Sequence, residues 1–219
     1  MNWIEEIKTL DLSKNKYSQT GEEVILQHIF SKIGTTNRYL VDFGAGDGFT
    51  LSNSALLLEN GWTGLRMDGN NRGNKTVNRE FIMPGNICDL FEKYKVPEQF
   101  DLLSIDMDSC DFLVLSFILK YCYRPRIVCA EYNPAFNPGE SKYLKYEHGY
   151  MWDGTTKYGF SLNAGRRLMD HYGYSLFYNQ RFLNLFFIDN DLFGKLDIDV
   201  PDQKMIFHPV SQNAEWVNY

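Results

Sequence analysis

The sequence predicts an α/β protein with a mainly parallel sheet, a C-terminal antiparallel hairpin and helices on both faces. Strand-like segments alternate with segments of helical periodicity along most of the chain, which is the order that builds a parallel sheet. Near the C-terminal end, two apolar segments, Tyr174–Tyr178 and Leu183–Ile188, are joined by a short polar turn and predict the hairpin. Acidic residues or glycines follow four of the predicted strands, and such strand ends meet at one edge of a parallel sheet.

The first helix and the first strand have the clearest local patterns. Thr20–Glu23 has the spacing of a capping box, in which the first and last residues satisfy each other's free backbone donors. Three isoleucines then recur every fourth residue from Ile25, and the predicted helix stops at Gly34. Arg38–Phe43 has the pattern of a strand and runs into the glycine-rich turn Gly44–Gly48.

The later elements continue the alternation. Further strands are predicted at Gly64–Asp68, Phe100–Asp106 and Arg126–Glu131. Further helices are predicted at Ser52–Asn60, Asp111–Tyr121 and Ser161–Tyr172. Either Asp108 or Ser109 is the expected cap of the helix that starts at Asp111.

Three stretches lack a clean period. Residues 69–80 are polar and predict a loop, whereas residues 81–87 predict a short strand interrupted by Pro84. Residues 134–160 are rich in Tyr, Gly and Pro, and we expect them to leave the core as an excursion.

Composition excludes several classes of protein. The chain has 219 residues and a net charge of −6, which argues against a dedicated nucleic-acid binder because such proteins neutralise phosphates. No apolar run is long enough to span a membrane, and the N-terminus lacks the pattern of a signal peptide. The four cysteines have neither CxxC nor Cys/His spacing, so we expect reduced packing residues in a cytoplasmic protein.

The glycine-rich turn and the acid after the next strand predict a nucleoside-containing cofactor. Glycines at 44, 46 and 48 allow the backbone to pass close to a ligand, and Asp68 can accept hydrogen bonds from both ribose hydroxyls. A dinucleotide fingerprint needs a further glycine where this chain has Phe49, and the charge of Asp47 opposes a pyrophosphate. An acid in this loop suits a cofactor with an ammonium, a sulfonium and no phosphate, which is S-adenosylmethionine.

At these residues the sequence resembles the class I S-adenosylmethionine-dependent methyltransferases. Val41–Gly48 is similar to the first motif of that superfamily, and the broader pattern resembles the FkbM-like branch, largely O-methyltransferases of sugars and natural products. The matching segments within residues 17–189 are Tyr17-Ser18-Gln19, Leu51-Ser52-Asn53, Gly61-Trp62-Thr63-Gly64, Ser104-Ile105-Asp106-Met107-Asp108 and Glu131-Tyr132-Asn133-Pro134. The resemblance implies a Rossmann-like, seven-stranded fold in one domain over residues 1–219, with 134–160 as an acceptor-side insertion or lid.

The resemblance also implies roles for single residues. The expected contacts of the methionine part of the cofactor are Gly44, Ala45, Gly46, Ser18 and Gln19, with Asp42 orienting the loop and Asn53 beside it. The expected contacts of the ribose and adenine are Asp68, Gly69, Asn86 and Ile87. Asp106 is expected to face the methyl group and the acceptor. Asn70-Asn71-Arg72 departs from the family pattern, so the resemblance does not identify the residues that contact the edge of the adenine.

Methyl transfer needs an aligned acceptor and, in most cases, a base for its proton. The candidates for catalysis are Asp106, Asp108, Glu131 and His148. The three acids could act as a base or hold a divalent metal that lowers the pKa of an acceptor hydroxyl. Simpler structural roles stay open for Asp108 as a helix cap, for Glu131 as an arginine partner and for His148 as a surface residue.

The leading hypothesis is O-methylation of a small molecule, such as a sugar or a sugar-containing metabolite. The first alternative is an NAD-dependent oxidoreductase. The second is a catalytically inactive cofactor-fold protein that serves as a binding module. Base methylation of nucleic acid is disfavoured, because Asp106-Met107-Asp108-Ser109 lacks the Asn/Asp-Pro-Pro-aromatic pattern. The sequence decides neither metal dependence nor oligomeric state.

Overall fold

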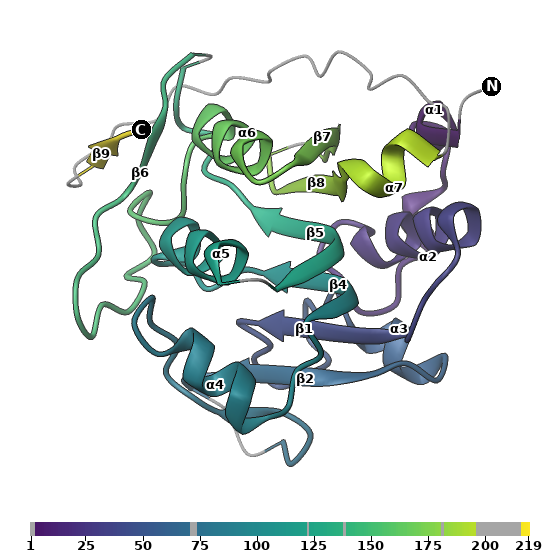
Figure 1. Cartoon of the computed structure of the whole chain (residues 1–219), viewed down its shortest axis with the longest axis horizontal. Helices are drawn as coiled ribbons and strands as arrows, with labels where there is room; N and C mark the ends of the chain where they lie inside the picture. Colours follow the sequence, from purple (N-terminus) through teal and green to yellow (C-terminus); the bar gives the residue numbers. More distant parts are fainter. Residues whose placement is uncertain (1–2, 71–73, 122, 138, 181, 196–215) are drawn as a thin grey trace.

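The computed structural model describes residues 3–70, 74–121, 123–137, 139–180, 182–195 and 216–219 (Figure 1). Seven strands of this part of the chain form one sheet in the order β3-β2-β1-β4-β5-β8-β7. Their bounds are β1 (Tyr39–Phe43), β2 (Thr63–Asp68), β3 (Asn78–Arg79), β4 (Gln99–Ile105), β5 (Arg124–Glu131), β7 (Tyr174–Asn179) and β8 (Asn184–Asp189). β8 runs antiparallel to both of its neighbours, and the other adjacent pairs are parallel. The predicted fold class is confirmed.

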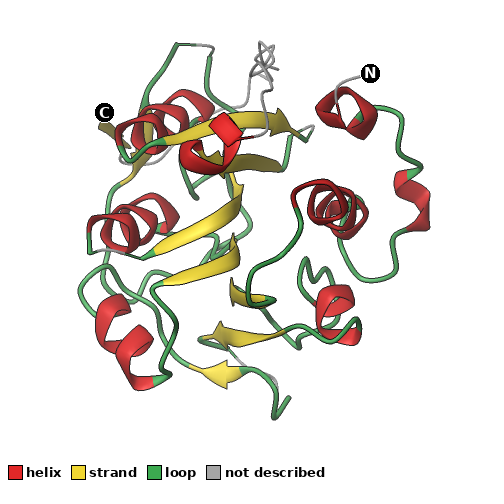
Figure 2. Ribbon diagram, turned by 45° about the vertical axis from the view of Figure 1, so that its right-hand side comes forward, coloured by secondary structure: helices red, strands yellow, loops and turns green. Residues whose placement is uncertain are grey.

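Helices cover both faces of the sheet (Figure 2). One face carries α1 (Trp3–Ile7), the short 3-10 helix η1 (Leu12–Lys14), α2 (Glu22–Ile33) and α3 (Ala55–Glu59). The other carries α4 (Ile87–Lys93), α5 (Asp111–Lys120) and α6 (Leu162–His171). Each layer of helices closes its own hydrophobic cluster against the sheet, and α7 (Asn190–Lys195) follows β8.

The start of α2 differs from the predicted capping box. The acid is the predicted one, but its partner is Ser18 and not Thr20. The backbone N–H of Glu23 donates to Ser18 Oγ at 3.4 Å, and the N–H of Ser18 donates to the Glu23 carboxylate at 3.3 Å. Thr20 instead donates through its N–H and hydroxyl to Glu22. Because Gly21 adopts a φ of +99° at the N-cap, the chain turns there and brings the earlier serine into reach.

The register of the parallel strands places their carboxyl ends together. Phe43 of β1 lies opposite Met67 of β2 and Ile105 of β4, and Ile105 lies opposite Ala130 of β5. The chain leaves β1 for β2 on one side, whereas β4 lies on the other side. The residues that follow β1, β2, β4 and β5 therefore lie beside the switch in strand order, where ligands bind in sheets of this type.

The strand predicted over residues 81–87 is wrong. The third strand is the two-residue β3 within the stretch predicted as a loop, and it pairs with Met67 and Asp68 of β2. Residues 81–83 have no regular structure and residues 84–86 form a turn. The Asn86 carboxamide donates to the Phe81 carbonyl and accepts from the Met83 N–H. Pro84 has no N–H for a ladder, so it fits the turn better than a strand.

The excursion over residues 134–160 contains one short strand, β6 (Lys142–Leu144). It pairs with β9 (Trp216–Asn218) in a separate antiparallel ribbon, visible beside the main sheet in Figure 1. The Leu144 N–H donates to the Gly159 carbonyl and the Ser161 N–H donates to the Lys142 carbonyl, which returns the excursion to α6. β6 therefore connects the excursion both to the start of α6 and to β9.

Cys88, Cys110 and Cys129 are free thiols, while Cys122 lies outside the described residues, as do residues 71 and 72 of the Asn-Asn-Arg departure. In the described ranges, no helix combines the length and the apolar character that crossing a bilayer requires.

Candidate functional site

A cleft of about 900 Å³ opens at the carboxyl edge of the sheet. Its walls come from the ends of β1, β2, β4 and β5, from the turn after β3, and from residues 150–158 of the excursion. Eight of the residues predicted for the site line it: Gln19, Gly44, Gly46, Asp68, Gly69, Asp106, Asp108 and Glu131. The structure therefore brings these eight residues together in one cleft.

The glycine-rich turn is shaped by the positive φ angles of three glycines, at 44, 46 and 48. Gly44 has a φ of +72°, and a Cβ there would lie 1.6 Å from the Asp106 carbonyl oxygen, so the turn touches the end of β4 directly. Gly46 has a φ of +51°, and a Cβ there would meet nothing within 4 Å. Gly46 also lines the cleft, so this part of the turn leaves room for a ligand beside its backbone.

Asp68 connects β2 to the glycine-rich turn. One carboxylate oxygen accepts from the Gly46 N–H at 2.9 Å, and the other accepts from the Asn70 N–H at 2.6 Å. The side chain is thereby fixed at the cleft wall with acceptor capacity left on both oxygens. This is the arrangement required to accept two hydroxyl groups of a ribose.

Asp42 and Asn53 lie beneath the turn and do not line the cleft. Asp42 accepts from the Ser54 hydroxyl at 2.6 Å, and burial raises the pKa of its carboxyl to about 6. Asn53 is also buried and donates to Ser104 Oγ at 3.3 Å. Both tie the turn and the start of α3 to the sheet, which supports the predicted orienting role of Asp42 and gives Asn53 a structural role.

The segment before α2 is held by a buried carboxylate. Glu23 accepts from the backbone N–H groups of Lys16, Tyr17 and Ser18. This set of bonds positions Gln19 at the cleft wall, whereas Ser18 is buried and directs its hydroxyl to Glu23. Gln19 is therefore the better placed of the two residues predicted to hold the methionine carboxylate.

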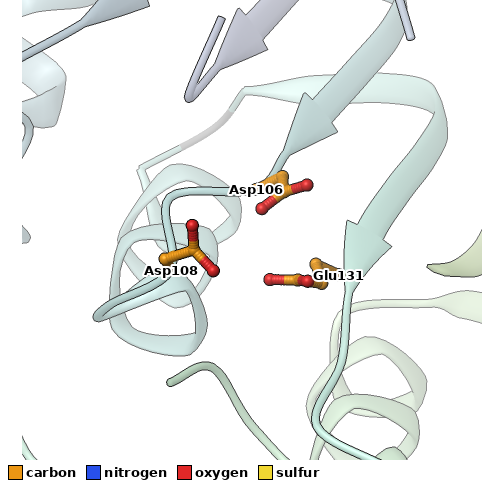
Figure 3. Close-up of side chains that lie close together, drawn as sticks. All are labelled: Asp106, Asp108 and Glu131. Atoms are coloured by element: carbon orange, nitrogen blue, oxygen red, sulfur yellow. The ribbon is translucent and has the colours of Figure 1, made fainter. Parts of the chain in front are cut away.

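Three carboxylates converge on the cleft side of β4 and β5 (Figure 3). Asp106 follows β4, Glu131 ends β5, and Asp108 lies between β4 and α5; one oxygen of each lies within 4.8 Å of the others. Asp108 has a φ of +54°, a backbone region that is uncommon for residues other than glycine. We call these three residues the acid cluster.

Asp108 does not cap α5 as predicted, and neither does Ser109. The N-cap residue is Cys110, which makes no side-chain cap. Asp111, in the first turn of α5, instead holds the preceding loop, because its buried carboxylate accepts from the N–H groups of Met107 at 2.7 Å and Ser109 at 2.9 Å. Asp108 is thereby free to face the cleft.

Burial and mutual repulsion hold protons on the acid cluster. Burial, followed by the charges of Asp108 and Asp111, raises the pKa of Asp106 to about 8. Burial and the neighbouring Asp106 carboxylate raise the pKa of Glu131 well above its usual range. Burial and Asp111 raise the pKa of Asp108 to about 6. Near neutral pH the cluster thus contains both protonated and ionised carboxyl groups, as acid–base chemistry requires.

The remaining predicted site residues lie outside the cleft wall. Ala45 is buried within the turn, Asn86 closes the turn before α4, and Ile87 is fully buried in the core. His148 is exposed, with its Nδ1 3.2 Å from the Tyr146 hydroxyl, so the geometry gives no support to its predicted role as a base.

Several cleft residues were not predicted from the sequence. Phe81 and Ile82 line the part of the cleft beside Asp68, where Asn86 and Ile87 were expected. Tyr150, Met151 and Tyr158 line it from the excursion. Composition gave one signal for the second group, since aromatics make up 16% of the chain and many of them lie in residues 134–160. The first group depended on the position of β3, which its two residues did not reveal.

No protein-family model and no curated protein matches the sequence significantly. Among solved structures, magnesium protoporphyrin IX methyltransferase (ChlM) from Synechocystis PCC 6803 is 11% identical, with 77% of this chain and 81% of that chain covered and a TM-score of 0.46. An S-adenosylmethionine-dependent methyltransferase from Clostridium acetobutylicum is 10% identical, covers 84% and 96%, and has a TM-score of 0.43. Human N-acetylserotonin methyltransferase is 11% identical, covers 85% and 66%, and has a TM-score of 0.38.

These neighbours are S-adenosylmethionine-dependent methyltransferases, and this chain is similar to them at low identity. Such similarity decides neither the family nor the activity of this chain. Its function is therefore inferred from the geometry of the cleft alone.

Proposed function

We propose that this protein is an S-adenosylmethionine-dependent methyltransferase of the FkbM-like type that methylates a hydroxyl of a small molecule, such as a sugar. One observation carries the proposal: the glycine-rich turn, the Asp68 carboxylate and the acid cluster all line one cleft. The first two form a nucleoside site without a phosphate-binding loop. The third places acid–base groups beside it, where an acceptor would need them.

The residues present fit this cofactor. Gly44 and Gly46 keep side chains away from the turn, and Gln19 and Asp68 stand on either side of it. When bound, S-adenosylmethionine supplies an electrophilic methyl group on a sulfonium. The turn and Asp68 orient it, and Phe81 and Ile82 offer an apolar surface to its base.

The acid cluster would accept the proton of the acceptor hydroxyl. Asp108 has the lowest pKa of the three, so it is the ionised member near neutral pH and the preferred base. Asp106 and Glu131 share a hydrogen bond and a proton, which keeps them in place behind it. A divalent cation bound by the same three oxygens would instead lower the pKa of the hydroxyl, and both routes use the same residues.

Residues 134–160 would form the acceptor side of the cleft within a single methyltransferase domain. Tyr150, Met151, Trp152 and Tyr158 come from this segment and line the same cleft as the glycine-rich turn. The segment is anchored at both ends, by β6 and by the contacts that precede α6. It can therefore act as a lid without detaching from the sheet.

Two observations disfavour an NAD-dependent oxidoreductase. Asp47 lines the cleft in the turn that a pyrophosphate would need to approach, and the Phe49 side chain is exposed where a dinucleotide-binding turn has its third glycine. The convergence of the acid cluster also disfavours a purely structural binding module, because buried like charges destabilise a fold that does not use them.

Calorimetric titration with S-adenosylmethionine, S-adenosylhomocysteine and NAD, with and without magnesium, tests the proposal. We expect micromolar binding of both adenosyl compounds and none of NAD. Asp68→Ala should abolish this binding, and Asp106→Ala should preserve it while turnover is lost. Glu98→Ala is the matched control, since Glu98 is exposed just before β4 at the opposite edge of the sheet.

Each outcome has a defined meaning. Failure of both adenosyl compounds to bind would overturn the methyltransferase proposal, and tight NAD binding would replace it with the oxidoreductase. A magnesium-dependent gain in turnover that Asp108→Asn removes would favour metal assistance. Turnover that persists in a chelator would favour the carboxylate base.

A further inference from the structure

The acceptor wall of the cleft carries exposed rings and apolar side chains. Met151 and Trp152 are each 49% exposed, although both line the cleft. Phe81 and Leu51, also exposed, line the same cleft from the other elements. Large apolar side chains that remain exposed around one opening indicate a surface that a ligand covers.

The rings on this wall are already fixed by hydrogen bonds. Trp152 Nε1 donates to the Thr155 carbonyl at 2.8 Å, and the Tyr150 hydroxyl donates to the Lys157 carbonyl at 2.7 Å. The Trp152 and Tyr158 rings meet edge to face, with centroids 6.5 Å apart. Because these polar atoms bind the backbone of their own loop, Tyr150 and Trp152 offer a ligand the apolar surface of their rings and no free polar atom.

Tyr158 differs from the other two aromatics. No hydrogen bond of its hydroxyl is found within the described part of the chain, and Tyr158 lines the cleft. Burial and the nearby Glu131, Asp108 and Asp106 carboxylates raise the pKa of Tyr158, so its hydroxyl stays protonated. It can therefore donate a hydrogen bond to an oxygen of the acceptor close to the acid cluster.

The charge of the lining has one sign. Six carboxyl residues line the cleft, whereas no Lys, Arg or His does so among the residues that the structure describes. Glu80 is paired with Lys93, and Asp47 and Asp68 accept backbone N–H bonds, but the acid cluster has no cationic partner in the same lining. Two lysines of residues 134–160 are paired with glutamates of the same segment: Lys142 with Glu140, and Lys157 with Glu147. A cleft lined by one sign of charge concentrates its field and repels ligands of that sign.

We propose that the acceptor is a ring compound without a negative charge, held against Tyr150, Trp152 and Tyr158 and facing the acid cluster. The site takes uncharged or ammonium-bearing rings and rejects phosphate and carboxylate esters of the same ring. This inference rests on the proposed function, and it names the class of substrate that the same cleft selects. Nucleotide sugars and sugar phosphates are excluded by it, whereas free sugars, aryl glycosides and amino sugars are accepted.

Three probes that differ in one group test the charge rule. They are 4-nitrophenyl β-D-glucopyranoside, its glucuronide, which carries a carboxylate, and its 2-amino-2-deoxy analogue, which carries an ammonium. Each is titrated by calorimetry into protein saturated with S-adenosylhomocysteine. We expect the glucuronide to bind at least about tenfold more weakly than the glucoside, and the amino analogue to bind at least as tightly as the glucoside.

Variants separate the contributions of charge and ring contact. Asp108→Asn should reduce the discrimination against the glucuronide severalfold. Trp152→Ala should weaken all three probes alike and leave their ratio unchanged. Tyr121→Ala is the control for aromatic removal, because Tyr121 is exposed at the end of α5 and does not line the cleft.

The results distinguish failure of this inference from failure of the proposed methyltransferase function. If S-adenosylhomocysteine does not bind, the methyltransferase proposal fails. If it binds and the glucuronide is held as tightly as the glucoside, the charge rule alone is overturned. Absence of saturable binding by both the glucoside and the amino analogue at millimolar concentration, with the cofactor product bound, would overturn it as well.

Discussion

At the scale of single residues, Gly44 is the most constrained position of the cleft. Its positive φ and its close approach to the Asp106 carbonyl join the glycine-rich turn to the end of β4, where the acid cluster begins. No other residue type fits both conditions, because a Cβ needs space that the backbone of the β4 end already fills. The contact therefore fixes the separation between the glycine-rich turn and the acid cluster.

Gly44→Ala should lower both stability and cofactor binding. The left-handed backbone alone costs about 1–2 kcal/mol for a residue with a Cβ, and the clash adds to it by displacing the turn or the end of β4. Gly61→Ala is a matched control, because Gly61 has a φ of +82° but open space around its Cβ. Urea unfolding and S-adenosylhomocysteine titration of the two variants measure the difference. Equal losses of stability and intact binding in both would contradict the role assigned to the contact.

At the scale of elements, Asp101 ties three segments together at the sheet edge opposite the cleft. This fully buried residue of β4 forms an ion pair with Arg126 of β5, at 2.7 Å. It also accepts from the backbone N–H groups of Thr36, Asn37 and Arg38, which connect α2 to β1. Its single carboxylate thus holds the start of β1 against β4 and β5.

Asp101→Asn should destabilise the protein by about 3–5 kcal/mol, since it leaves Arg126 without its charge partner and removes acceptors from several N–H groups. Cofactor affinity below the unfolding transition should stay unchanged, because the cleft lies at the other end of the strands. Asp191→Asn, at an exposed position on α7, should leave both properties as they are. Chemical denaturation and calorimetry give the two readouts. A loss of affinity in the folded Asp101 variant would show that the two sheet edges are not independent.

Much of the element level could be predicted from the sequence, because long strands and helices leave strong periodic patterns. β1, β4, β5 and the pair β7–β8 all lie where the apolar segments placed them. β3 could not be predicted, since two residues make no pattern and its pairing with β2 is a tertiary contact. The predicted caps of α2 and α5 were wrong for a related reason. The bonds that Ser18 and Asp111 make there depend on turns whose geometry is set by Gly21 and by the end of β4.

The residues of the candidate site likewise include some that the sequence could predict and some that it could not. Residues directly after strands, such as Asp68 and Asp106, were predictable because topology alone brings strand ends together. Tyr150 and Tyr158 were not, because an irregular segment carries no rule for which side chains face a cleft. His148 comes from the same segment, but it is exposed and does not line the cleft, so its predicted role as a base has no support in the geometry.

At the scale of the whole molecule, the acid cluster couples stability to pH. The folded state holds a proton on Asp106 up to about pH 8, whereas an unfolded aspartate releases it near pH 4. The folded state therefore binds more protons than the unfolded state between these values, and stability must fall as the pH rises through this window. The facing carboxyl groups that contribute are Asp42, Asp108, Asp111 and Glu131.

Asp106→Asn should remove a large part of this dependence. In the presence of a chelator and without ligand, the wild-type protein should lose at least about 1 kcal/mol more than the variant between pH 5 and pH 8. Denaturation curves across this range provide the measurement, and Glu98→Gln should follow the wild type. A variant whose stability declines as steeply as that of the wild type would place the protons elsewhere.

The pairing of β6 with β9 has a consequence for the order in which the protein is made. Residues 142–144 cannot form their ribbon until residues 216–218 have left the ribosome, whereas the strands up to β5 can pair much earlier. The strands whose ends would hold the cofactor are thus all synthesised before the ribbon that anchors the wall of the acceptor can form. A chain without Trp216–Asn218 would keep these strands and lack the partner of β6.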